Sequence, residues 1–326
     1  MRELYYSHAI REALEEEMER DERVVLLGED LAEYGGAFKV TANIAQRFGD
    51  ERVRNTPISE GGFVGVAVGA AMTGLRPVAE IMFMDFITLA MDQLINHAAK
   101  MRYMYQGQVS VPLVVRTPSG AGRAYGPTHS QSFERHFVAT PGLIILAPAT
   151  AADAKGLLKA AIRCDDPVVF LESKVLYGRR GPVPDGDEVT PIGVARIARE
   201  GEHVTIAAYS RMVEESLRAA EALAEKGIEA EVIDLRTLAP LDMETLAASV
   251  GKTGRLVAVE EGCLTGGVAA EIVSRVVAEC FYDLEAPPKR VAAMDLPVPA
   301  SPGLERAVIP DAADIARAAA EVVAQG

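Results

Sequence analysis

The sequence predicts an α/β protein with two domains, the first built around a largely parallel sheet and the second a smaller α/β domain. A chain of 326 residues is too long for one ordinary core and fits two domains. Short apolar runs alternate with helical periodicity, which is typical of parallel sheets covered by helices. Residues 177–193, rich in proline and glycine, should lack regular structure. We therefore expect domains at 1–180 and 193–326, joined by a linker at 181–192.

Helices and buried strands alternate in the first half. Residues 4–20 place Ile10, Ala13, Leu14 and Met18 on one face of a helix. Residues 24–30 form a continuous apolar run that ends in acids, as in a parallel strand buried on both faces. Further strands are expected at 77–86, 111–118, 143–149 and 167–173, and helices at 89–102 and 152–163.

The second half repeats this alternation on a smaller scale. Strands are expected at 203–210, 229–240 and 254–262, and helices at 212–226 and 268–278. In such sheets ligands bind in loops beyond the carboxyl ends of the strands, so functional residues should follow strands.

Composition excludes several classes of protein. A formal net charge of −14 lacks the basic footprint that nucleic acid requires, so we expect no nucleic-acid partner. No run approaches the roughly 18 apolar residues of a membrane helix, and the acidic N-terminal segment does not resemble a signal peptide. Three distant cysteines form neither a disulfide framework nor a metal site. We expect a cytoplasmic protein without membrane association.

Common catalytic motifs are absent from the sequence. It has no GxGxxG after a strand, no phosphate-binding GxxxxGK[ST], no histidine pair suited to zinc and no GxSxG. The residues alone therefore leave both an enzyme and a non-catalytic binding module open.

Six segments, taken in their order and spacing, resemble one known family. They span residues 26–41, 55–80, 83–104, 128–137, 153–172 and 231–246, and include PISEGG, FMDF and THSQSFE. Together they resemble the beta subunit of the thiamine-diphosphate-dependent decarboxylase component of 2-oxo-acid dehydrogenases. The resemblance covers nearly the whole chain.

This resemblance implies half of an active site. The family's beta subunit has a pyrimidine-binding domain and a transketolase-like C-terminal domain. Two alpha and two beta subunits assemble, with thiamine diphosphate between an alpha and a beta. The alpha subunit holds magnesium and the diphosphate through a GDG…N pattern, whereas this chain has only GDE, at 49–51 and 186–188. A lipoyl-bearing acyltransferase component is the further partner.

The implied reaction is oxidative decarboxylation of a small 2-oxo acid, with transfer of the acyl group to lipoyl. ISEGGFVGVAVGAA and FMDFITLAMDQ look closer to pyruvate and acetoin enzymes, whereas SQSFE resembles branched-chain enzymes. Pyruvate is therefore favoured, with acetoin and branched-chain 2-oxo acids as alternatives. A split transketolase-type half, which would need a basic cluster for sugar phosphates, and a non-catalytic scaffold are further alternatives.

The resemblance implies active-site roles for three residues. Glu60 matches the acid that hydrogen-bonds to the cofactor's pyrimidine and drives it to its imino tautomer; otherwise such an acid would only stabilise a helix N-terminus. Phe86 matches the aromatic residue that stacks on the pyrimidine, although such residues more often belong to the core. His129, in a glycine-rich loop, matches a histidine that faces the reaction centre and donates a proton or hydrogen bond; a lone loop histidine is more often solvated.

The resemblance also implies a structural potassium ion, bound mainly by backbone carbonyls. Its matching positions are Leu113, Ala161, Cys164 and Asp166. Cys164 stands where some relatives have an acid, which a carbonyl ligand tolerates. His136 is expected to be structural, and Arg116 and Arg123 are open candidates for contacts near the cofactor.

Overall fold

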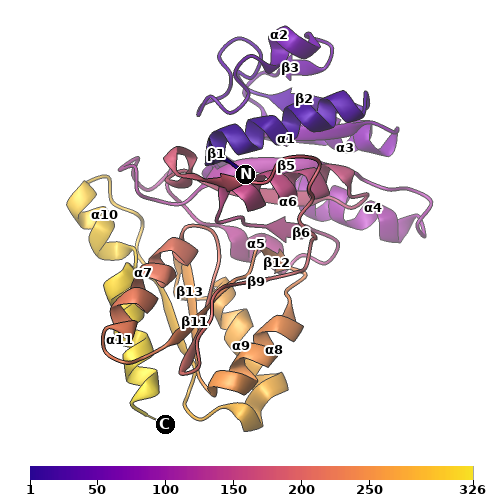
Figure 1. The fold of residues 1–326 in the computed structure, drawn as a ribbon. Helices are drawn as coiled ribbons and strands as arrows, with labels where there is room; N and C mark the ends of the chain where they lie inside the picture. The colour runs from indigo at the N-terminus through magenta and orange to yellow at the C-terminus, as the bar shows by residue number, and fades with distance from the viewer. Residues whose placement is uncertain (326) are drawn as a thin grey trace. The chain divides into compact units, whose positions relative to one another are not determined.

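The computed structural model describes residues 1–325, which form two compact units. Residues 1–119 and 136–192 make the first unit, and residues 120–135 join the chain from Gly193 onward in the second. Figure 1 draws the chain from indigo at the N-terminus to yellow at the C-terminus. Residues 120–135 therefore belong to the second unit, although their position in the sequence lies within the expected first domain.

A parallel sheet forms the centre of the first unit. Six of its strands follow the order β6-β7-β5-β4-β2-β3, and each neighbouring pair among them is parallel. The predicted α/β class with mostly parallel strands is thus confirmed. These strands are β2 (Val24–Gly28), β3 (Val53–Asn55), β4 (Arg76–Glu80), β5 (Val114–Ser119), β6 (Ile144–Leu146) and β7 (Val168–Ser173).

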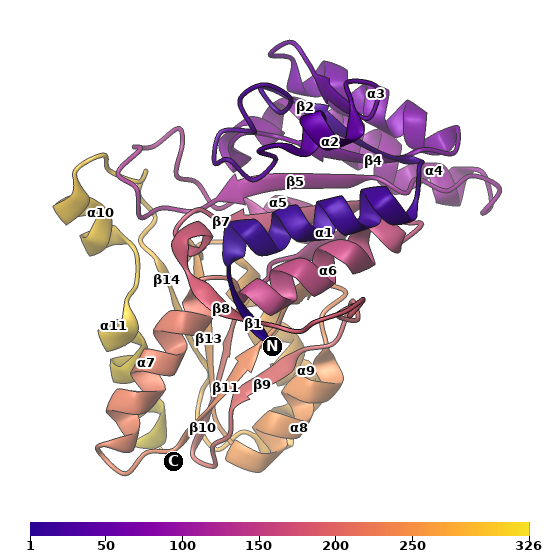
Figure 2. The same ribbon diagram turned by 45° about the horizontal axis from the view of Figure 1, so that its top comes forward.

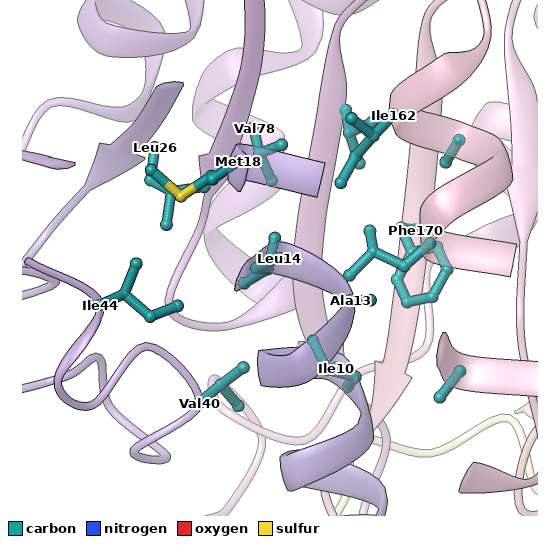
Figure 3. Close-up of a cluster of buried hydrophobic side chains, with 14 of the residues drawn as sticks. Ile10, Ala13, Leu14, Met18, Leu26, Val40, Ile44, Val78, Ile162 and Phe170 are labelled. Atoms are coloured by element: carbon teal, nitrogen blue, oxygen red, sulfur yellow. The ribbon is translucent and has the colours of Figure 1, made fainter. Parts of the chain in front are cut away.

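Helices cover both faces of this sheet. α1 (Tyr6–Arg20) packs along α6 (Ala151–Arg163) on one face, and α3 (Glu60–Met72) lies on the other (Figure 2). The predicted apolar face of α1 is confirmed, because its side chains point into the buried cluster of Figure 3. The shorter helices are α2 (Ile44–Phe48), the 3-10 helix η1 (Met84–Ala90), the π-helix η2 (Gln93–Ala98), α4 (Ala99–Met104), α5 (Glu134–Val138) and the 3-10 helix η3 (Leu176–Gly178).

Two predictions about local structure were wrong. The stretch 177–193 is not wholly irregular, because β8 (Arg180–Val183) pairs antiparallel with β1 (Arg2–Tyr5). A two-stranded ribbon consists only of edge strands, where the proline of β8 is tolerated. The strand expected at 77–86 ends at Glu80, so Phe86 lies in η1 and not at a strand end.

The second unit contains a five-stranded sheet in the order β14-β13-β10-β11-β9, in which only β9 is antiparallel to its neighbour. α7 and α11 lie together on one face, and α8 and α9 on the other (Figure 1). Within residues 1–325, no helix has the length and apolar character needed to cross a membrane. The strands are β9 (Arg196–Arg199), β10 (Val204–Ala208), β11 (Ala230–Asp234), β12 (Thr237–Ala239), β13 (Leu256–Cys263) and β14 (Lys289–Ala293). The helices are α7 (Met212–Ala224), α8 (Met243–Thr253), α9 (Val268–Cys280), the 3-10 helix η4 (Phe281–Asp283), α10 (Pro302–Val308) and α11 (Ala312–Val323).

Candidate functional site

Three neighbouring strands of the first unit bring polar side chains to the edge of the sheet where their carboxyl ends meet. Gly28, at the end of β2, pairs with Asn55 of β3 on one side and Glu80 of β4 on the other. Glu29 and Thr56 follow these strands directly and therefore lie at the same edge. Glu29 Oε1 and Thr56 Oγ1 are buried and have no hydrogen-bond partner within residues 1–325. Because unsatisfied buried polar atoms are costly, this edge is suited to binding a polar group.

Glu60 begins α3 close to this edge and is only 4% exposed. Burial raises the pKa of Glu29 to about 7, and the negative charges of Glu60, Asp30 and Glu80 add to the rise. Glu29 therefore takes up and releases a proton near neutral pH beside Glu60. Sequence reasoning missed Glu29, although an acidic pair directly after a buried strand was a visible signal.

A glycine in α3 lets the segment that carries Phe86 approach Glu60. A Cβ atom on Gly61 would lie 2.9 Å from the carbonyl oxygen of Leu89, so only glycine permits η1 to pack this closely against α3. Phe86 is half-buried in η1 and meets Phe83 edge to face, with ring centroids 6.0 Å apart. The structure thus brings Glu60 and Phe86 into two elements in direct contact.

Arg116, an open candidate for a cofactor contact, lies inside the core of the first unit. Its Nε and Nη2 atoms donate to the two carboxylate oxygens of Glu172, each at 2.7 Å, and its Nη1 donates to Glu80. The Tyr177 hydroxyl also donates to Glu172, at 2.6 Å. Burial lowers the pKa of Arg116, but Glu172 and Glu80 outweigh burial and raise that pKa far above its ordinary value. The charged guanidinium therefore fixes Glu80 at the edge of the sheet.

His129 lies in the second unit, in residues 120–135, which we call the His129 loop. The N–H of Gly120 donates to the carbonyl of Gln131 at 3.1 Å and closes the loop. His129 is half-buried, and its Nδ1 lies 3.1 Å from Thr128 Oγ1. Ser130 is 2% exposed, and its Oγ has no hydrogen-bond partner in the described part of the chain. Arg123 is an exposed residue of this loop, and the exposed His136 directly follows it.

The positions expected to bind potassium lie at or near the ends of three elements of the first unit, β5, α6 and β7. They are Leu113, Ala161, Cys164 and Asp166. The carbonyl of Cys164 accepts from Arg76 Nη1 at 3.0 Å, and the Asp166 carboxylate pairs with Arg102 at 2.6 Å. A carbonyl has a second lone pair, so the first bond leaves it able to bind another group.

Side-chain chemistry at this position favours a carbonyl ligand over a thiolate. Burial raises the pKa of the Cys164 thiol, and the neighbouring Asp166 and Asp165 add to the rise. Among residues 1–325, no group of three or more His, Cys, Asp or Glu side chains is arranged to hold a metal ion.

Two family models match the chain. Residues 2–180 match "Transketolase, pyrimidine binding domain", and residues 193–315 match "Transketolase, C-terminal domain". The solved structure titled "Split gene transketolase, inactive beta4 tetramer" has a TM-score of 0.82, with 99% of each chain covered and 24% sequence identity. At that identity the likeness shows the fold alone.

Several curated proteins are similar along almost the whole length of this chain. "Pyruvate dehydrogenase E1 component subunit beta-1, mitochondrial" of Arabidopsis thaliana is 49% identical over 97% of this chain and 88% of its own. "Pyruvate dehydrogenase E1 component subunit beta" of Rickettsia felis is 46% identical over 96% of both chains. The protein of the same name from Rhizobium meliloti is 48% identical over 94% of this chain and 67% of its own. The predicted family is therefore confirmed: this chain belongs to the pyruvate dehydrogenase E1 beta subunits, which are thiamine-diphosphate-dependent 2-oxo-acid dehydrogenase subunits.

Proposed function

We propose that this chain is the beta half of an enzyme that decarboxylates pyruvate on thiamine diphosphate and transfers the acetyl group to lipoyl. An alpha subunit supplies the other half, in an assembly of two alpha and two beta subunits. The observation that carries the proposal is the buried Glu60 at the start of α3, beside Glu29 and the unpaired oxygen of Thr56. The names of relatives that are 46–49% identical support pyruvate as the substrate.

The residues at this edge fit an aminopyrimidine ring. The exocyclic amino group can donate to Glu29 Oε1, and the ring nitrogen that Glu60 does not bind can accept from the Thr56 hydroxyl; neither of these oxygens has another partner in the described residues. Phe86 offers a ring face from η1. When bound, thiamine diphosphate supplies a nucleophilic carbon and an electron sink for decarboxylation.

Glu60 holds a proton at the pyrimidine ring nitrogen in this proposal. Its carboxyl group hydrogen-bonds to that nitrogen and so favours the imino tautomer, which is the base that the reaction needs. Phe63 and Val64 follow Glu60 in α3 and are buried, so they exclude water from this carboxyl group. His129 donates a hydrogen bond or proton to the substrate, a task for which imidazole is suited at neutral pH.

Ions and partners complete the proposal. The alpha subunit holds magnesium and the diphosphate, and backbone carbonyls at Leu113, Ala161, Cys164 and Asp166 hold a potassium ion. We place the enzyme in the cytoplasm, with a lipoyl-bearing acyltransferase component as its partner. If a basic domain of that component binds this acidic chain, raising the salt concentration should weaken the complex, and an affinity that does not change with salt would exclude an electrostatic contact.

Glu60→Gln tests the proposed chemistry in the complex with the alpha subunit. The amide cannot share a proton as a carboxyl group does, so decarboxylation should fall by at least about 100-fold. The native mass of the complex should not change. Glu33→Gln, at an exposed position of the same unit, is the matched control and should retain full activity. A Glu60→Gln complex with wild-type turnover would refute the enzyme proposal and favour a non-catalytic scaffold.

Substrate competition separates the remaining alternatives. The complex should turn over pyruvate with a higher kcat/KM than acetoin or a branched-chain 2-oxo acid. Preferred turnover of acetoin or of the branched-chain acid would assign the chain to the corresponding dehydrogenase. Preferred turnover of a sugar phosphate would instead identify a split transketolase-type half.

A further inference from the structure

Two carboxylates of the second unit hold the backbone at the start of the His129 loop. Glu305 of α10 accepts the N–H of Gly122 at 2.9 Å, and its two oxygens lie 3.2 and 3.1 Å from the nitrogen of Ala124. Glu261 of β13 accepts the N–H of Ala121 at 2.5 Å. Both side chains are buried, with Glu305 5% and Glu261 8% exposed.

Backbone conformation turns these N–H groups toward the carboxylates. Gly120, Gly122 and Ala124 all have positive φ angles, of 84°, 95° and 55°. Backbones in which left-handed residues alternate with ordinary ones form concave sites whose N–H groups bind an anion. Because a left-handed conformation is unfavourable for alanine, Ala124 needs surrounding contacts to keep it. The Glu305 carboxylate supplies such a contact.

Close packing leaves no room for a side chain at the first residue of the loop. A Cβ atom on Gly120 would lie 2.7 Å from both carboxylate oxygens of Glu261. The next residue, Ala121, is buried in a small apolar cluster with Ala293, Val308 and Ile309. The start of the loop is therefore fixed by polar contacts on its N–H groups and by apolar contacts on its side chain.

Two backbone hydrogen bonds within the loop link these contacts to the region around His129. Gly120 donates to the carbonyl of Gln131, two residues after His129, and the N–H of His129 itself donates to the carbonyl of Gly126 at 3.3 Å. The carboxylates therefore hold residues 121–124, and the hydrogen bond from Gly120 links this held segment to Gln131, close to His129. The His129 loop lies within residues 2–180, which match the pyrimidine-binding domain, but contacts within the second unit hold it.

We propose that Glu305 and Glu261 are positioning residues, which keep the His129 loop in the conformation that the reaction requires. This inference rests on the proposed function, since it assumes that His129 takes part in catalysis. It assigns a function to the C-terminal unit: the carboxylates of Glu305 and Glu261 hold the His129 loop through its backbone N–H groups, in addition to the apolar contacts of Ala121.

Glu305→Ala tests the proposal in the complex of the full chain with its alpha subunit. Amide hydrogen exchange at 122–124 and tryptic cleavage after Arg123 report on the loop without reference to activity. Both should accelerate by about tenfold or more, because hydrogen bonds to a charged acceptor are roughly twice as strong as neutral ones. The kcat for lipoyl acylation should fall while the KM for the 2-oxo acid changes little. Glu321→Ala, which removes a carboxylate from an exposed ion pair with Lys289, is the control and should change none of these.

Glu305→Gln is the second variant, because it keeps the side-chain volume and one acceptor oxygen and should show a smaller acceleration. If exchange and cleavage in both variants match the wild type, the carboxylate does not hold the loop and the proposal is wrong. If the loop loosens but acylation keeps its wild-type kcat, Glu305 does not position the loop for the reaction and the positioning role is overturned. A wild-type complex without thiamine-dependent activity would instead refute the proposed function, while hydrogen exchange would still decide whether Glu305 binds the loop.

Discussion

The buried ion pairs of Arg116 allow a quantitative prediction for Arg116→Met. Arg116 is 1% exposed, and its guanidinium contacts both oxygens of Glu172 as well as Glu80. Methionine fills much of the same space without a charge, so two buried carboxylates lose their cation. Breaking a buried ion pair from one side typically costs about 3–5 kcal/mol.

Protonation of the two acids sets an upper limit to this cost. An uncompensated glutamate with an ordinary pKa of about 4.3 can take up a proton at pH 7 at a cost of about 3.7 kcal/mol, so two acids cost at most about 7 kcal/mol. We therefore expect the variant to lose about 3–7 kcal/mol of unfolding free energy at pH 7. In the variant the native state binds more protons than the unfolded state, so its stability rises as the pH falls. The deficit should shrink by about 1.4 kcal/mol for each pH unit and each acid that is protonated.

Urea unfolding of the full chain, followed by far-ultraviolet circular dichroism at several values between pH 5.5 and 7.5, measures this deficit. The chain has no tryptophan, so intrinsic fluorescence is a poor probe. Arg116→Met combined with Glu172→Gln is the matched control, and it should recover part of the lost stability at pH 7.5. A deficit that is equal at both ends of the pH range would refute the electrostatic reasoning and assign the loss to packing alone.

Three further predictions concern other residues of the two units. Burial raises the pKa of Glu134 to about 8, so the native state binds the extra proton between about pH 4.5 and 8 and wild-type stability falls as pH rises. Glu134→Gln should therefore raise Tm at pH 8.5 but not at pH 5, and an equal shift at both would contradict this. A Cβ on Gly142 would lie 2.0 Å from the carbonyl oxygen of Ala99, whereas Gly107, also at positive φ, faces open space. Gly142→Ala should therefore lower Tm well beyond Gly107→Ala, whose cost should be about 1–2 kcal/mol; equal losses would show that the backbone adjusts. Glu29, with a pKa of about 7, should make thiamine diphosphate binding depend on pH between 6 and 8, and Glu29→Gln should flatten that dependence in calorimetric titrations.

The periodicity of apolar residues in the sequence was enough to predict several helices and strands of this protein. The apolar face of α1 and the buried runs of β2 and β7 could be predicted because burial against a sheet imposes its pattern on adjacent residues. The order and spacing of six motifs identified the family. Glu60 and Phe86 were predicted as site residues through those motifs, since an acid or an aromatic residue in isolation has commoner structural roles.

Tertiary contacts decided what periodicity could not. The sequence left Arg116 as an open candidate for a cofactor contact, whereas the structure shows that its partner is Glu172, 56 residues away. Glu29 is a candidate site residue because strand pairing places it near Glu80 and Glu60. The His129 loop belongs to the second unit because Glu305, more than 180 residues later, binds its backbone. A sequence pattern reports which residues are buried, but the partners of a buried charge or a loop come from distant segments, and only folding brings them together.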